Sequence, residues 1–457
     1  FQLIDRPTRI TENSAYILDL VITDSPGYMQ NIGQLMPLSN LDHNIVHGQL
    51  KFIRPSRNNI KREMWHFKNA DIVGLTQSLS NAPWDVGFTV YDNIDDMTGY
   101  VRGLLLDTAK EYIPVRQVSL RSKDKPWFNG YIRRLIRLRN RWSGTFQRTR
   151  RLEHKVIRDY YRAMVHLETQ QAKNRNTARL KERLGDPNIS VKTYYSISKS
   201  LYGGKIHSGI PVMIEEDKLV SSDSDKADLF CQLFADQCTL LPLPPNFSLP
   251  DFSFITDARM ESCNATPAKV EKLLYSLNIG KATGPDGISN KLLKVTATSI
   301  AGPLSTLFNK SMELKSFPSE WKKGNWSPVY KKGEKYLKSN YRPVSLLSCI
   351  SKVFEKLVFI ELYEYLTVNN LLTERNSGFK PLDSTVNQLI HITQSIYDSL
   401  NEGDDVCMVF LDVSKAFDKV YHEGLLFKLK QMGVCGKLLG WIDSYLTGRE
   451  QRVVING

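Results

Sequence analysis

The chain has 457 residues, a net charge of +13 and six scattered cysteines without a C-x-x-C pair. This length predicts two to four domains with sizeable hydrophobic cores. The cysteine pattern argues for a reducing compartment and against a zinc site or a disulfide framework, and no apolar run approaches membrane-spanning length. The chain begins at Phe1 without a signal-peptide pattern and stops within RVVING, so we expect both ends to be cut from a longer protein.

Periodicity and turn residues predict the elements in chain order. The expected strands are 16–24, 43–52, 406–413 and 452–456. The expected helices are 70–80, 93–112, one or two basic helices from within 126–142 to about Leu184, then 225–238, a capped helix at the start of 266–288, 291–297, 301–315, 351–369, 384–401, 423–432 and 436–446. The proline-rich stretch 241–254 predicts irregular chain, and no internal repeat is visible.

Positive charge is concentrated in the middle of the chain. Residues 131–183 hold sixteen Lys and Arg against four Asp and Glu, which leaves a net charge of +12. This excess favours a polyanionic partner, above all nucleic acid. A solvated basic helix is the alternative, and it is the commoner origin of an isolated charge run.

The strand VCMVFLDV (406–413) is apolar throughout, so we expect it to be buried on both faces. Near its end stands Asp412, and a carboxylate in that position is a common ligand of Mg²⁺, although alone it is more often a helix N-cap. Nucleotidyl transfer commonly uses two such ions. The residues 414–416 would turn the backbone towards a triphosphate, with Phe417 against the sugar.

Four segments resemble motifs of one family. LDVSKAFDKVYHEGLL (411–426) resembles the first catalytic motif of reverse transcriptases of non-LTR, LINE-type retrotransposons, especially the jockey and chicken-repeat-like group. Segments 281–294, 317–358 and 374–389 resemble that family's successive fingers and palm motifs. Four motifs in the family's order are far more specific than any one of them.

The resemblance implies a role for each matching residue. Asp412 is expected to bind the catalytic metal ions, Phe417 to exclude a ribose 2′-hydroxyl, and Arg342 to neutralise the incoming triphosphate. The further residues expected to bind dNTP are Lys331, Lys332, Lys415 and Ala416. For the two neighbouring lysines a solvated turn is an equally good interpretation.

Other residues of these motifs have structural roles in this interpretation. Local hydrogen bonding that shapes the turn is expected of Asp418 and His422. The GPDG sequence at 284–287 is expected to form a turn near the template.

The family's second catalytic motif, a Tyr-x-Asp-Asp hairpin, does not occur in the sequence. The Asp404-Asp405 pair precedes Asp412 and reads as the turn into the strand. One carboxylate is not expected to hold two Mg²⁺ ions in catalytic geometry. We therefore expect this 457-residue polypeptide to have no appreciable polymerase activity by itself.

The N-terminal sequences LDLVITD and NLDHNIV resemble the end of an exonuclease III-like endonuclease domain, which members of this family place before the polymerase. By that resemblance His43 is the catalytic histidine, Asp19 orients it, and Asp42 is a ligand of a metal ion or water. A carboxylate can fix the imidazole tautomer while the histidine stabilises or protonates a phosphoryl oxygen.

Two departures from the endonuclease pattern limit this expectation. Leu41 stands where the family usually has serine, and the family's upstream metal-binding Glu and substrate-binding Asn residues do not occur. No nicking activity is therefore expected from this chain. An incidental Asp-His within a strand-turn-strand is the alternative.

The basic segment between these two regions resembles the linker of such elements. Its expected nucleic-acid contacts are Arg133, Arg134, Arg137, Arg141, Arg150 and Arg151. Charge binds phosphates, and aromatic side chains can stack on unpaired bases. The aromatic residues concerned are Trp127, Trp142, Phe146, Tyr160 and Tyr161, for each of which ordinary packing is the commoner role.

The sequence as a whole predicts an α+β protein. Residues 1–55 would be the end of a four-layer α/β endonuclease sandwich, 56–260 a helical basic linker, and 261–457 the fingers and part of the palm of a right-hand polymerase, with its core motifs in 317–457. The resemblance implies Mg²⁺ or Mn²⁺ as cofactor, and element RNA, target DNA and dNTPs as partners. It implies no membrane, and a nuclear and cytoplasmic life cycle.

Three functions are compatible with these patterns. The first is an RNA-directed DNA polymerase of a non-LTR retrotransposon. The second is a non-catalytic protein that binds nucleic acid through the basic segment. The third is an RNA polymerase of another lineage, which Phe417 argues against because such enzymes usually carry an acidic residue there.

Overall fold

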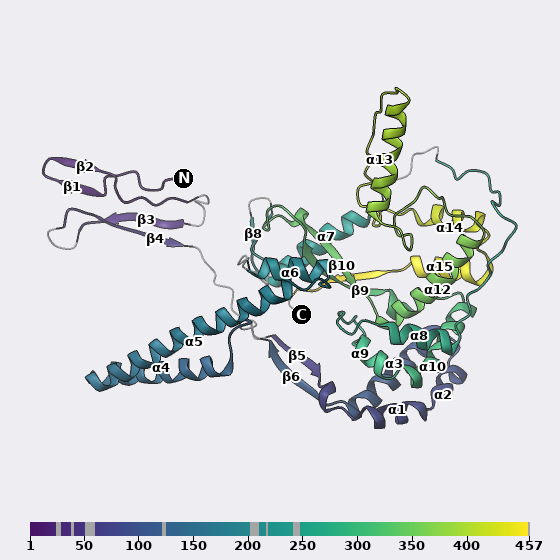
Figure 1. Cartoon of the computed structure of the whole chain (residues 1–457), viewed down its shortest axis with the longest axis horizontal. Coiled ribbons are helices and arrows are strands. Elements are labelled where there is room, and N and C mark those ends of the chain that lie inside the picture. Colours follow the sequence, from purple (N-terminus) through teal and green to yellow (C-terminus); the bar gives the residue numbers. More distant parts are fainter. Residues whose placement is uncertain are drawn as a thin grey trace. The chain divides into compact units, whose positions relative to one another are not determined.

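The computed structural model describes residues 1–23, 29–37, 41–50, 60–120, 125–201, 210–215, 218–240 and 247–455. The chain divides into two compact units, Phe1–Asn58 and Asn59–Gly457 (Figure 1). Helices and small sheets are mixed, which agrees with the predicted α+β class. Within the described ranges, none of the helices combines the length and the apolar character needed to span a membrane.

The first unit is built from two antiparallel strand pairs. Its strands are β1 (Arg9–Thr11), β2 (Ser14–Tyr16), β3 (Met29–Leu35) and β4 (Ile45–Leu50). β1 pairs with β2, and β3 pairs with β4. Main-chain hydrogen bonds from Ile10 N to Asp42 O and from Asn44 N to Thr8 O join the start of β4 to β1.

The predicted strand at 43–52 is confirmed as β4, with residues 51 and 52 outside the described chain. The predicted strand at 16–24 is wrong over most of its described length, where only Tyr16 lies in a strand and Ile22 forms an isolated bridge. The reason is local. The Thr8 hydroxyl accepts hydrogen bonds from the amides of Leu18 and Asp19, which are therefore bonded to a side chain rather than to a neighbouring strand.

A helical core organises the second unit around α10 (Ala297–Glu313). The helices that share this core are α1 (Ile72–Ser80), α2 (Trp84–Val90), α3 (Ile94–Tyr112), α8 (Pro267–Ser276), α9 (Asn290–Val295), α12 (Cys349–Val368) and α15 (Gly436–Leu446). Phe308 stacks on Phe354 with ring centroids 4.4 Å apart. Residues 72–112, which the domain prediction assigns to the linker, are thus packed with helices of the polymerase-like region.

Amphipathic spacing explains how α3 joins this core. Met97, Val101, Leu105 and Ala109 recur every fourth residue and are buried, which is the stripe expected of a helix packed on one side. The Asn93 side chain caps the first turn by accepting from Asp96 N.

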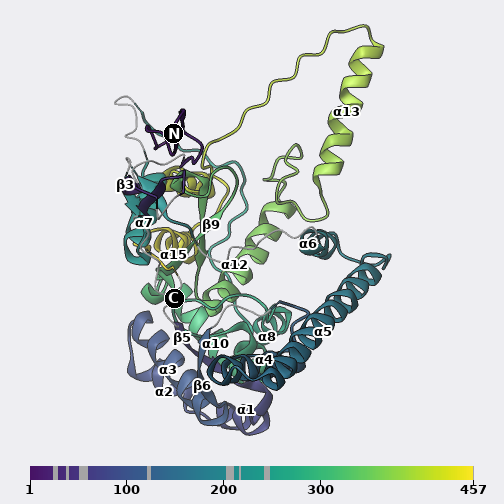
Figure 2. The same cartoon turned by 90° about the vertical axis from the view of Figure 1, so that its left-hand side faces the viewer.

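Two long antiparallel helices, α4 (Gly130–Thr149) and α5 (Leu152–Leu184), lie side by side in both views (Figures 1 and 2). We call them the basic hairpin. Asn129 caps α4 by accepting from Ile132 N, and Arg150 has a left-handed φ of 52° at the turn. The prediction of basic helices that end at Leu184 is confirmed.

A three-stranded sheet forms the second structural centre of this unit. Its strands are β9 (Lys323–Tyr330), β10 (Tyr341–Leu346) and β11 (Glu450–Val453). β9 lies in the middle, antiparallel to β10 and parallel to β11. α7 (Asp223–Cys238) packs on one face, where Phe230 and Phe234 are fully buried against Tyr341 and Trp326.

The predicted buried strand at 406–413 is wrong in this structure. The segment is extended but belongs to no strand, and Phe410 and Leu411 are 82% and 91% exposed. It follows α13 (Thr385–Asn401), and Figure 2 shows the long extended course of the chain after that helix. An apolar run is buried on both faces only where neighbouring strands pair with its backbone, and among the described residues no strand does so.

Most other predictions agree with the structure within a few residues. The remaining elements are η2 (Phe67–Asn69), β5 (Ile60–Trp65), β6 (Val115–Leu120), α6 (Val191–Leu201), β7 (Met213–Glu215), β8 (Lys218–Val220), α11 (Ser319–Lys322), η3 (Lys338–Asn340) and α14 (His422–Gln431). The proline-rich stretch is irregular at 247–254, and 241–246 lie outside the described chain. The predicted terminal strand at 452–456 overlaps β11 only at Arg452 and Val453, because β11 begins earlier and ends at Val453, and residue 456 lies outside the described chain.

Candidate functional site

Arg342 lies on the open face of the three-stranded sheet. Side chains alternate along a strand, and its neighbour Tyr341 faces α7, so Arg342 faces the opposite side, where it is exposed. Beside it in register is Val329 of β9. Within the described chain no carboxylate pairs with Arg342, so its guanidinium is available for an anionic ligand.

The open face carries further polar groups. Asn325 of β9 is paired with Arg452 of β11, and Arg452 Nε donates to Asn325 Oδ1 over 2.7 Å. Lys331 continues β9 into an exposed turn, and its amide donates to Asn340 O over 2.8 Å. Lys332 follows in the same exposed turn. The two lysines therefore lie at the end of the sheet where β10, the strand of Arg342, begins.

The GPDG turn packs against the other end of β10. A β-carbon at Gly284 would overlap the main chain of Leu347 and Ser348, so only glycine allows this approach. Gly287 has a φ of +78°, which also favours glycine. The predicted turn thus fixes the end of the strand that carries Arg342.

Two half-buried acidic residues, Asp286 and Glu320, lie at the same turn. Burial raises the pKa of the Asp286 carboxyl, and its Oδ1 accepts from Ile288 N over 3.3 Å. Burial also raises the pKa of Glu320, although Arg102 Nη1 lies 3.1 Å from Glu320 Oε1. Arg102 comes from α3, far away in sequence. Sequence reasoning missed this contact because nothing in the local pattern of α3 indicates a partner for its single arginine.

Asp412 lies in the extended, exposed segment before α14. The following residues form a tight turn in which Lys415 has a φ of 55° and Asp418 N donates to Lys415 O over 2.9 Å. Phe417 contacts Phe379 edge to face, with centroids 5.6 Å apart. The structure therefore brings the turn that carries Phe417 into contact with Phe379 of segment 374–389. Ala416, which precedes Phe417 in the turn, is exposed.

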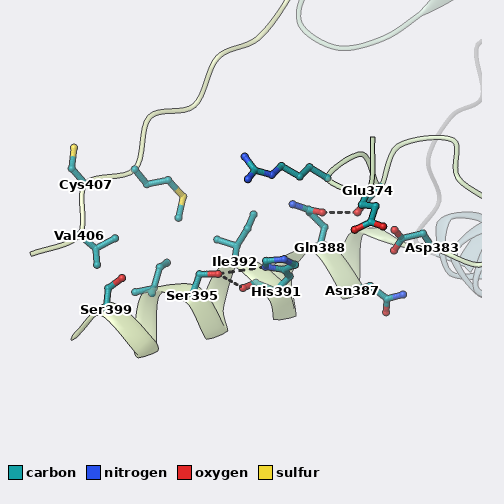
Figure 3. Close-up of a pocket in the computed structure, with 14 residues that line it drawn as sticks. Glu374, Asp383, Asn387, Gln388, His391, Ile392, Ser395, Ser399, Val406 and Cys407 are labelled. Carbon is teal, nitrogen blue, oxygen red and sulfur yellow. Dashed lines mark hydrogen bonds between the residues drawn. The ribbon is translucent and has the colours of Figure 1, made fainter. Parts of the chain in front are cut away.

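A cavity of about 870 Å³ lies beside this segment (Figure 3). Glu374, Asp383 and Gln388 line it on one side, His391 of α13 lines its floor, and Cys407 lies opposite. Ser377 Oγ donates to Gln388 Oε1 over 2.5 Å. Several lining residues lie in segment 374–389, which the sequence analysis identified as a motif, but none of them was predicted as a site residue.

Reverse transcriptases generally use divalent metal ions, whereas the described residues show no assembled metal site. No three His, Cys, Asp or Glu side chains of the described ranges come together as a metal site. Asp412 offers one hard oxygen ligand group, whereas a catalytic metal pair is held by several. We therefore derive no metal-dependent step from this structure.

The first unit brings the predicted Asp19 and His43 together. His43 Nδ1 and Asp19 Oδ2 are 2.8 Å apart. The bond to His43, followed by that to Thr8, lowers the pKa of Asp19. Arg9 Nε donates to Asp42 Oδ2 over 2.7 Å, and this bond lowers the pKa of Asp42. Asp42 is thus engaged by Arg9, a residue to which the sequence analysis assigned no role.

The predicted arginines of the basic hairpin are all exposed. Arg133, Arg134, Arg137, Arg141, Arg150 and Arg151 are exposed, and α4 contains no acidic residue. The interleaved aromatic residues are largely engaged within the hairpin. Lys173 lies over the Trp127 ring at 5.1 Å and Arg158 over the Phe146 ring at 4.8 Å.

Comparison with known proteins gives the class. Residues 329–457 match the family described as reverse transcriptase (RNA-dependent DNA polymerase). This range includes Arg342, Asp412 and Phe417. The chain therefore carries a reverse transcriptase domain, which confirms the sequence-based prediction, whereas the endonuclease domain stays a prediction.

The curated relatives are transposon proteins. The chain is similar to the probable RNA-directed DNA polymerase from transposon X-element of Drosophila melanogaster, with 33% identity over 40% of this chain and 20% of the relative. It is also similar to the RNA-directed DNA polymerases from mobile element jockey of Drosophila melanogaster (28% identity, 42% of this chain, 21% of the relative) and Drosophila funebris (22%, 81% and 41%). The matches span less than half of each relative.

Proposed function

We propose that the protein containing this chain is the RNA-directed DNA polymerase of a non-LTR retrotransposon. The observation that carries the proposal is the reverse transcriptase match over 329–457, which contains the candidate triphosphate and catalytic residues in the family's order. An unpaired arginine on an open sheet face supports it, because a planar guanidinium binds phosphate oxygens bidentately.

Each candidate residue has a distinct role in this proposal. Arg342 binds the phosphates of the incoming dNTP, with Lys331 and Lys332 as weaker contacts at the same end of the sheet. Asp412 is the carboxylate required for nucleotide addition. Phe417 discriminates against the ribose 2′-hydroxyl by its bulk, and the exposed ring leaves it accessible to a nucleotide.

Steady-state primer extension tests whether Arg342 binds the triphosphate. The enzyme for this assay is the longer protein that contains this chain. We expect Arg342→Gln to raise the KM for dNTP by roughly 10- to 100-fold, the effect of losing a charge-assisted hydrogen bond pair. The control is Lys310→Gln, which removes the same charge from a half-buried position on α10. An unchanged KM in Arg342→Gln, or an equal rise in both variants, contradicts the assignment.

We also propose that the Asp19–His43 pair is the remnant of a phosphodiester-cleaving site. The 2.8 Å contact supports this second function, because a carboxylate bonded to Nδ1 leaves Nε2 free to face a phosphoryl oxygen. A nicking assay on supercoiled plasmid by the complete polypeptide tests it. Nicking that persists in His43→Ala contradicts the role of His43.

A non-catalytic nucleic-acid-binding protein is the remaining candidate. The excess of arginine in α4 favours it, since charge of this kind binds phosphates without chemistry. One measurement distinguishes the two functions. A polymerase extends a primer when dNTPs are supplied, whereas a protein that only binds nucleic acid does not.

A further inference from the structure

Four of the six arginines of α4 form one stripe on the side of the helix that faces away from α5. Successive residues of an α-helix are about 100° apart around its axis. Ile132 and Leu135 are buried, and Trp142 and Phe146 are half-buried, on the side of α4 that contacts α5. The stripe consists of Arg134, Arg137, Arg141 and Arg148, which fall within about 60° of one another on the opposite side. We call this set the outer arginine stripe.

The outer arginine stripe is not neutralised by the protein. α4 has no Asp or Glu, and within the described chain no carboxylate pairs with any of the four arginines. The ion pairs of the hairpin lie elsewhere, at Arg158 with Asp159 and at Arg175 with Glu168, both within α5. The stripe runs for about 21 Å at 1.5 Å per residue, so it can contact several consecutive phosphates.

The aromatic residues of the hairpin indicate which form of nucleic acid fits. Binding of single strands relies on aromatic faces that stack on bases. Here the Trp127 and Phe146 rings are covered by Lys173 and Arg158, and Trp142 packs on His154 with centroids 5.6 Å apart. Tyr131 is exposed but lies about 90° from the middle of the stripe around the α4 axis. The outer side of α4 therefore offers charge without a stacking platform, and the exposed Tyr160 belongs to α5.

We propose that the outer arginine stripe binds double-stranded DNA, with the outer side of α4 in the major groove. The B-DNA major groove is about 12 Å wide and admits one α-helix, whereas the major groove of A-form RNA is too narrow for side chains to read. Arginine also binds phosphates and guanine edges bidentately. This inference rests on nucleic acid as a partner in the proposed function, and it specifies the form of that partner.

Fluorescence anisotropy with the full chain tests the proposal. The probes are a 20-base-pair DNA duplex, an RNA duplex of equal length, and the single strands of each. We expect the DNA duplex to bind at least about tenfold more tightly than the other three probes, with an affinity that falls steeply with salt.

Two variants with equal charge change locate the surface. The first replaces Arg134, Arg137, Arg141 and Arg148 by Gln, and the second replaces Lys155, Arg179, Lys181 and Arg183 of α5. We expect the first to reduce the slope of log affinity against log salt by about 3 to 4, near 0.9 per lost phosphate contact, and to weaken duplex binding at least about 100-fold. The second should weaken it less than about fivefold, and both should retain wild-type helicity by circular dichroism.

The outcomes separate this proposal from the one it rests on. Preference for RNA or for single strands, or an equal loss in both variants, overturns the duplex-DNA assignment and leaves nucleic acid as a partner. Weak binding of every probe that does not respond to salt overturns both. Neither result depends on the KM for dNTP that is measured with Arg342→Gln.

Discussion

Single side chains in the first unit are held by partners from distant parts of its sequence. Asp19 and His43 come together because the chain from Asp42 to Asn44 pairs with β1 and the Thr8 hydroxyl holds the amides of Leu18 and Asp19. The sequence motif indicated both members of the pair. It did not indicate Thr8, since a buried threonine hydroxyl leaves no pattern in the sequence.

Titration of the two aspartates tests this arrangement. We expect the Asp19 midpoint, followed by carboxyl ¹³C NMR, to lie below its ordinary value of about 3.9 and to rise towards it in His43→Ala. Because the folded pKa is lowered, the pair stabilises the fold above the ordinary pKa, and this contribution is lost as the pH falls through the folded pKa.

Arg9→Ala is the matched control for that titration. It should raise the pKa of Asp42, whose lowered value comes first from the bond to Arg9, and leave that of Asp19 unchanged. A midpoint of Asp19 that moves equally in both variants contradicts the assigned hydrogen bonds.

At the scale of elements, α7 and the three-stranded sheet depend on one another. Phe234 is fully buried and meets Trp326 of β9 edge to face at 5.6 Å, while Phe230 packs on Tyr341 of β10 at 5.0 Å. Tyr341 is the residue next to Arg342. The packing of α7 on one face therefore fixes which way Arg342 points on the other.

Truncation of one buried ring measures this coupling. We expect Phe234→Ala to destabilise the second unit by about 3–5 kcal/mol and to reduce hydrogen-exchange protection of the β9 and β10 amides before that of α10. The control Phe359→Ala removes a ring that is 46% exposed and should change the free energy of unfolding by less than about 1 kcal/mol. If hydrogen-exchange protection falls equally in α10 and in the sheet, the helical core and the core between α7 and the sheet are not separate.

The elements also show where sequence reasoning succeeds and fails. Helices with caps and apolar stripes, such as α3 and α8, were predicted closely because their signals are local. The run at 406–413 was predicted as a buried strand from its composition alone, but burial depends on neighbouring strands that a short apolar run does not specify. The pairing of β11 with β9 was likewise beyond prediction, since it joins residues more than a hundred positions apart.

At the scale of the molecule, the second unit packs together segments that lie far apart in the sequence. Ser299 Oγ donates to Thr76 O, and Ser319 N donates to Asp95 Oδ1 over 2.6 Å, so α1 and α3 are bonded to helices some 220 residues further on. The motifs of the reverse transcriptase domain could be recognised from short local patterns. The packing of α1 and α3 against that region could not, because hydrophobic stripes show that a helix is buried without showing against what.

At the same scale, we propose that the reverse transcriptase domain acts through Asp412. The most direct measurement is extension of a DNA primer on an RNA template by the complete polypeptide, compared between wild type, Asp412→Asn and the control Asp405→Asn in the same exposed segment. We predict extension in wild type and Asp405→Asn and a loss of at least about 10³-fold in Asp412→Asn, as for removal of an essential catalytic group. Extension that survives in Asp412→Asn, or a wild type that binds the template and does not extend the primer, contradicts the claim.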